Sequence, residues 1–118
     1  MDKAALVEKL NDVFNAEKSN GLNVDQFGLA LAFPGFTSDS FTLGVSAPSL
    51  VGLTSHDKTK TIYEALYKYL TGEEKMAIDR VRVYDNAKDL KKSSYHDFED
   101  FGSSNYEFEL LPELHEVA

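Results

Sequence analysis

The chain has 118 residues, and its shares of hydrophobic residues (42%) and charged residues (27%) are those of a globular protein. It contains no cysteine, which excludes disulfides, thiol catalysis and thiolate metal sites. Its 20 acidic and 12 basic residues give a formal net charge of −8 and a pI near 4.7, which argue against direct binding to nucleic acids or to anionic membranes. The length predicts a single globular domain over residues 1–118.

An amphipathic helix is predicted over residues 2–19. Leu6, Leu10 and Phe14 recur at a spacing that places them on one helical face. Asp2 is positioned to cap the start of this helix, and the glycine at Gly21 provides a positive-φ stop.

Two strands are predicted next, over residues 26–33 and 41–45, joined by a loop of turn-forming residues into an antiparallel hairpin. In the first strand, large apolar side chains alternate with Gly28, Ala30 and Ala32. The small side chains favour a helix packed closely on that second face, so that both faces of the sheet are covered.

A second helix is predicted after the capping sequence that begins at Thr54, with Ile62, Leu66 and Leu70 in its buried stripe. Residues 73–77 form a further helical turn in this interpretation, and residues 80–84 form a third strand. A short helix is predicted over 87–92 and a fourth strand over 106–110, after which residues 114–118 are expected to fray. The order α-β-β-α-β-β predicts an α+β two-layer sandwich, with a mostly antiparallel four-stranded sheet and two helices on one face.

The negative charge is concentrated in residues 93–118. This stretch holds seven acids and no lysine or arginine, so residues 1–92, with 13 acids and 12 bases, are nearly neutral. Five of the 14 aromatic residues lie among those acids. Because disordered acidic tails are poor in aromatic residues, the sequence predicts that this end is at least partly folded and presents a negative surface.

The sequence contains no motif for catalysis or for binding a cofactor. Its histidines are not paired at metal-ligand spacing, and its glycines are too scattered for a phosphate-binding loop. The one cluster suited to a metal ion is His96, Asp97, Glu99 and Asp100, but it lacks the EF-hand pattern and is interpreted as a solvated acidic loop. We therefore expect neither an enzyme nor a cofactor.

The acidic and aromatic pattern of the C-terminal segment favours a protein-binding site. If Tyr106 and Phe108 lie in a strand and face the protein core, Glu107 and Glu109 of the same strand point outward, about 7 Å apart. A row of like charges is costly through repulsion, and a positive partner offsets that cost. The predicted partner-binding residues are Tyr95, Asp97, Phe98, Glu99, Asp100, Tyr106, Glu107 and Glu109.

The leading hypothesis is a non-enzymatic acidic domain that occludes a basic surface on a protein partner. That partner is a toxin such as a nuclease, which makes this chain an immunity-type inhibitor, or a nucleic-acid-binding protein for which it is a nucleic-acid mimic, or a secreted effector that needs an acidic chaperone. The chain has no apolar run that could cross a bilayer and no signal-peptide core, so the expected compartment is the cytoplasm.

Three other interpretations remain open. In the first, the acidity serves only solubility. In the second, the chain is an enzyme or a binding domain that holds a small ligand in a pocket between helices and sheet. In the third, it is a structural component that associates with itself through an edge strand. The ligand pocket would use Tyr63, Tyr67, Arg80 and His56.

Overall fold

Helix α1 (Lys3–Glu17) begins the structure where the apolar pattern predicts it. The structure is a computed structural model that describes residues 2–33, 35–91 and 114–117. Asp2 caps α1 by accepting a hydrogen bond from the Ala4 backbone N–H at 3.3 Å. The helix continues into a 3-10 turn, η1 (Lys18–Asn20), and the chain then turns away at Gly21, whose φ of 91° is easily adopted only by a residue without a Cβ.

The sheet contains four strands among the described residues, in the order β3-β2-β1-β4. Strands β1 (Gln26–Leu31) and β2 (Phe41–Ser46) form the predicted antiparallel hairpin, and β4 (His115–Glu116) pairs antiparallel with the other edge of β1. Strand β3 (Ile78–Tyr84) runs parallel to β2. The sheet is therefore mixed, and the prediction of a mostly antiparallel sheet was wrong for the pair β2–β3.

The parallel pair results from the connection between β2 and β3. This connection contains the 3-10 turn η2 (Pro48–Leu50), helix α2 (Ser55–Tyr69) and the short helix α3 (Gly72–Met76). A helical crossover of this length carries the chain back along the sheet, so that the next strand starts at the same end as the previous one. The helical turn expected over 73–77 is confirmed as α3, which adds one element to the predicted order.

Both helices of the connection begin with a side-chain cap. The Thr54 hydroxyl accepts a hydrogen bond from the Asp57 backbone N–H at 3.1 Å, as its capping sequence predicts. Thr71 and Glu74 form a reciprocal capping box at the start of α3. These caps satisfy backbone N–H groups that have no partner inside their own helices.

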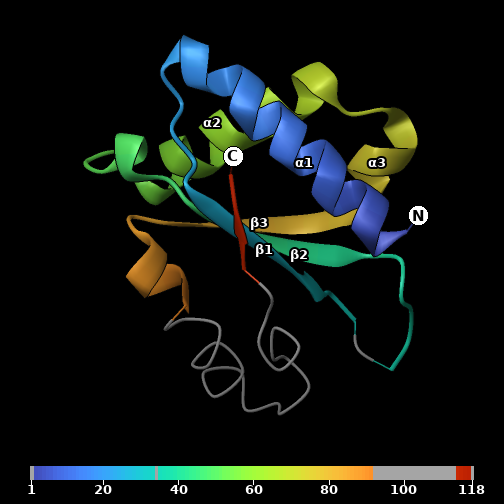
Figure 1. The fold of residues 1–118 in the computed structure, drawn as a ribbon. Coiled ribbons are helices and arrows are strands. Elements are labelled where there is room, and N and C mark those ends of the chain that lie inside the picture. The colour runs from blue at the N-terminus through green and yellow to red at the C-terminus, as the bar shows by residue number, and fades with distance from the viewer. Residues whose placement is uncertain (1, 34, 92–113, 118) are drawn as a thin grey trace.

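Helices α1 and α2 cover one face of the sheet (Figure 1). Their apolar stripes and the inward side chains of the strands form one buried cluster, so the predicted placement of two helices on one face is confirmed. The cluster includes Leu6, Leu10, Val13 and Phe14 of α1, Ile62, Ala65 and Leu66 of α2, and Phe27, Leu29, Phe41, Leu43, Val45 and Val81 of the sheet. No helix from α1 to α3 packs closely on the opposite face, where the glycines and alanines of β1 favoured one; the chain between α1 and β1 places α1 against the large side chains instead.

The last described residues correct the expectation for the C-terminal end. Residues 114–118 were expected to fray, but His115 and Glu116 pair with β1, and the Val117 N–H donates to the Asp25 carbonyl at 3.0 Å. The His115 ring also lies 5.4 Å from the Phe27 ring, which fixes this end against the core. The strand predicted over 106–110 lies outside the described residues.

The longest helices in the described ranges have 15 residues each, and none combines the length and the apolar character that a bilayer-spanning helix needs.

Glu17 links α1 to α2. Its side chain is almost fully buried, and its carboxylate accepts hydrogen bonds from the Asn20 amide, from the Lys68 ammonium at 3.2 Å and from the Tyr69 hydroxyl at 3.3 Å. The Asn20 hydrogen bond, helped by Lys68 and Tyr69, holds the pKa of Glu17 below its usual value, while burial opposes the shift.

The Glu17→Gln variant is expected to be less stable than the wild type by about 1 kcal/mol at neutral pH. Because the pKa of Glu17 is lowered by folding, its charge stabilises the fold above the unfolded-state pKa, and this contribution is lost as the pH falls through the folded-state pKa. Urea unfolding at about pH 7 and about pH 3 measures the effect, and the difference between variant and wild type should shrink at the lower pH.

Glu8→Gln is the matched control, because Glu8 is an exposed acid on the same helix. It should change the free energy of unfolding by less than about 0.5 kcal/mol at either pH. Equal losses in the two variants would show that the Glu17 contacts do not stabilise the fold.

Candidate functional site

The acidic segment 93–113 is bounded on both sides by residues that are fixed on the sheet. Before it, residues 87–91 form a helical turn after β3, capped by Asn86, whose side-chain oxygen accepts from the Asp89 N–H at 2.8 Å. Leu90 of this turn is fully buried. After the segment, β4 pairs with β1. The described structure therefore makes the acidic stretch a connection between two anchored points.

The predicted partner-binding residues all belong to this connection. Tyr95, Asp97, Phe98, Glu99, Asp100, Tyr106, Glu107 and Glu109 lie outside the described residues, as does the cluster around His96 that was considered for a metal ion. Their grouping therefore stays a prediction. The structure defines the surface from which the connection starts and to which it returns.

The face of the sheet opposite α1 and α2 consists of short side chains. The pairing register places Gly28 directly opposite Gly44, and Ala30 opposite Thr42, while Ser46 follows two residues along β2. We call these five residues the small-residue face. All five are buried.

Two arginines and a tyrosine border the small-residue face along β3. Arg80, Arg82 and Tyr84 pair with Thr42, Gly44 and Ser46, so their side chains leave the sheet on the same side. Arg80 forms an ion pair with the neighbouring Asp79, at 3.4 Å. This margin is the basic border of an otherwise uncharged face.

A hollow of about 310 Å³ lies at the edge of the sheet, between the first turns of α2 and the end of β3. Its lining combines two cationic side chains with hydroxyl groups: Ser55, Lys58 and Thr59 from α2, and Arg82, Val83 and Tyr84 from β3. Lys58 is bound to Asp85 at 2.6 Å. None of the four residues proposed for a ligand pocket, Tyr63, Tyr67, Arg80 and His56, is among this described lining.

Tyr63 and Tyr67 form an edge-to-face pair on α2, with ring centroids 6.0 Å apart. Tyr67 is exposed, whereas Tyr63 is half-buried, and burial together with the neighbouring Tyr67 and Asp79 raises the pKa of Tyr63. His56 is exposed in the first turn of α2. The pair therefore lies at the edge of the helical layer.

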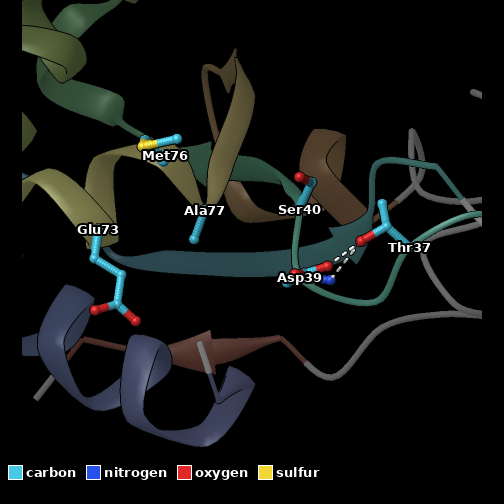
Figure 2. Close-up of a pocket in the computed structure, with 6 residues that line it drawn as sticks. All are labelled: Thr37, Asp39, Ser40, Glu73, Met76 and Ala77. Carbon is cyan, nitrogen blue, oxygen red and sulfur yellow. Dashed lines mark hydrogen bonds between the residues drawn. The ribbon is translucent and has the colours of Figure 1, made fainter.

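A broader hollow of about 550 Å³ lies between the β1–β2 loop and α3 (Figure 2). Its lining is Thr37, Asp39, Ser40, Glu73, Met76 and Ala77. The Thr37 hydroxyl donates to the Asp39 carboxylate and lowers the pKa of Asp39. Met76 of α3 lies at the rim of this hollow and is 82% exposed. Phe36, in the β1–β2 loop, is 92% exposed. Only the tertiary contact between loop and α3 creates this hollow, so no spacing in the sequence could predict it.

Within residues 2–33, 35–91 and 114–117, no three histidine, aspartate or glutamate side chains cluster in a way that could hold a metal ion.

Comparisons with family models, with curated proteins and with solved structures found no match to this chain. The basis for a functional proposal is therefore the chemistry of the described residues and the distribution of charge along the sequence.

Proposed function

We propose that this chain is a non-enzymatic protein-binding domain whose acidic segment, residues 93–113, occupies a basic surface on a protein partner. The observation that carries the proposal is the separation of charge. Seven of the 20 acids lie after residue 92, whereas all 12 lysines and arginines lie within residues 1–92. A single-sign surface of this kind accelerates association with an oppositely charged partner and disfavours other partners.

The anchoring of the segment supports the same function. A free acidic tail would lose much conformational entropy on binding, and that loss would weaken the complex. In this chain the buried Leu90 precedes the segment, and β4 follows it on the sheet. Fixing both ends lowers the entropy that binding must remove, so the same carboxylates bind more tightly than they would on a tail.

The chemistry of the segment defines the partner class. Carboxylates interspersed with aromatic side chains suit a basic groove that also offers apolar contact, because aromatic residues are common anchors of tight interfaces. A nuclease toxin, a nucleic-acid-binding protein and a basic secreted effector all present such grooves. In each case the mechanism is occlusion of the groove, by contact and by charge.

The test is the salt dependence of the complex. A tagged full-length chain retrieves its partner from a native extract at low salt, and after identification the purified pair is titrated in increasing NaCl. The Kd should rise at least tenfold between about 50 and about 500 mM NaCl, because the Debye length falls from roughly 14 to roughly 4 Å. A Kd that does not change with salt would contradict the proposal.

A further inference from the structure

The hollow between the first turns of α2 and the end of β3, which we call the α2–β3 hollow, has a lining of one charge sign. Two of the described residues that line its volume of about 310 Å³ are basic, Lys58 and Arg82, and none is acidic. A cleft lined by charges of one sign concentrates ions of the opposite sign. The hollow is therefore suited to an anion, in a chain whose formal net charge of −8 repels anions elsewhere.

Hydroxyl groups add uncharged donors to these two cations. Ser55, Thr59 and Tyr84 also line the hollow, and each carries a hydroxyl that can donate a hydrogen bond to an oxyanion. The ammonium group of a lysine has three N–H donors, and the guanidinium group of an arginine has five. Several donors around a lining without a carboxylate suit a multiply charged oxyanion such as a phosphate group.

The positions of these side chains are fixed by α2 and β3. Ser55, Lys58 and Thr59 are three and four residues apart on α2, so they lie on one face of that helix. At the end of β3, the Tyr84 carbonyl accepts a hydrogen bond from the Ala47 N–H at 2.9 Å. Because the donors are held by a helix and a strand, little conformational entropy is lost when an anion binds.

Lys58 is positioned by an ion pair with Asp85. The Lys58 ammonium lies 2.6 Å from the Asp85 carboxylate, and the side chain of Lys58 is 16% exposed whereas that of Asp85 is 43% exposed. Asp85 is not among the described residues that line the hollow. A single carboxylate oxygen takes one of the three donors of an ammonium group, so Lys58 has the capacity to bind a second anion as well.

The volume and the walls of the hollow favour a small ligand. Pockets for small molecules enclose about 300–1,000 Å³, and the α2–β3 hollow is at the lower end of this range. Val83 and the ring of Tyr84 provide apolar contact beside the donors. A phosphate group, alone or with a small organic substituent, matches this lining.

We propose that the α2–β3 hollow is a binding site for a phosphate group, either that of free phosphate or that of a small phosphomonoester. Lys58 and Arg82 pair with the phosphate oxygens. The hydroxyls of Ser55 and Thr59, on the same helix face as Lys58, donate further hydrogen bonds. No residue of the acidic segment takes part, so this inference goes beyond the proposed function and does not depend on it.

Titrations of the full-length, ¹⁵N-labelled chain with inorganic phosphate and with glycerol phosphate test the site, at an ionic strength held constant with NaCl. Amide shifts should saturate and should be largest over residues 55–59 and 82–84. Tighter binding of glycerol phosphate would support a phosphomonoester as the ligand, and binding of inorganic phosphate alone would support free phosphate. Shifts that do not saturate with either probe, or that spread evenly over the chain, would overturn the proposal.

Arg82→Gln should weaken the binding of these probes by at least about tenfold, because it removes charged donors from the lining. Arg80→Gln is the matched control, since Arg80 is on the same strand but is not among the described lining residues. It should change the affinity by less than about twofold. Equal weakening in the two variants would mean that net charge governs binding and would overturn the proposal.

A second pair of variants tests the helix side of the hollow. Lys58→Gln should weaken binding by about tenfold, whereas Lys60→Gln, at an exposed position of α2 outside the described lining, should change it by less than about twofold. The spectrum of each variant without phosphate shows whether it is folded. If Arg82→Gln does not fold, Arg82→Lys keeps the charge and should still weaken binding by about threefold, because it loses the planar fork of donors. Wild-type affinity in Lys58→Gln and in the folded Arg82 variant would overturn the proposal.

Discussion

Neutralising five carboxylates of the acidic segment is expected to weaken partner binding by roughly 30- to 150-fold. The variant carries Asp97→Asn, Glu99→Gln, Asp100→Asn, Glu107→Gln and Glu109→Gln. Exposed charge pairs contribute about 0.2–1 kcal/mol each, so the loss of five should cost about 2–3 kcal/mol of binding free energy. Titration calorimetry with the purified partner at low salt measures this cost.

The control removes the same amount of charge from the rest of the molecule. Five exposed acids from the described part of the chain are neutralised instead: Glu8, Asp12, Asp25, Glu64 and Glu73. Both variants change the formal net charge from −8 to −3. The control should bind within about threefold of the wild type, since only long-range attraction is reduced. Equal weakening in both variants would mean that total charge, and not the segment, governs binding.

Replacing Phe27 with alanine is expected to lower the free energy of unfolding by about 3–5 kcal/mol. Phe27 is fully buried in β1, and its ring lies 5.5 Å from that of Phe14 on α1 and 5.4 Å from that of His115 on β4. The cavity left by the ring would therefore loosen the helical layer and the anchor that follows the acidic segment. Urea unfolding followed by circular dichroism measures the loss.

Two further variants serve as a milder substitution at the same site and as an exposed control. Phe27→Leu keeps most of the buried volume and should cost about 1 kcal/mol, so it remains measurable if the alanine variant does not fold. Phe36→Ala removes a ring that is 92% exposed and should change stability by less than about 0.5 kcal/mol. A loss at Phe27 as small as that at Phe36 would contradict the assignment of the core.

The local patterns of this sequence predicted most of its helices and strands. Leu6, Leu10 and Phe14 mark the buried stripe of α1 because helical spacing repeats regardless of tertiary contacts. The caps at Asp2 and Thr54 were equally predictable, because each depends only on the two or three residues that follow it.

The sheet topology could not be predicted in the same way. Whether β3 runs parallel or antiparallel to β2 depends on how α2 and α3 carry the chain between them, and strand alternation is identical in the two cases. Strand β4 was not predicted, because it consists of only two residues, His115 and Glu116, and two residues show no alternating pattern. Its pairing comes from β1, which is ninety residues away in the chain.

The candidate site also combines features that the sequence shows directly with features that depend on tertiary contacts. The sequence shows where the acids and aromatic residues are, since charge and composition need no fold to be counted. It also shows the small side chains of Gly28 and Ala30, but their partners across the sheet, Gly44 and Thr42, depend on the hairpin register. The hollow beside Met76 depends on contact between a loop and a helix that are distant in sequence.

One salt series that compares the wild type with the five-acid variant shows whether the carboxylates of the segment contact the partner. If the anchored carboxylates meet a basic surface, the wild-type affinity falls steeply with NaCl while that of the variant hardly changes, so the two curves converge at high salt. Two parallel curves would show that these carboxylates do not make the contact and would contradict the proposed function.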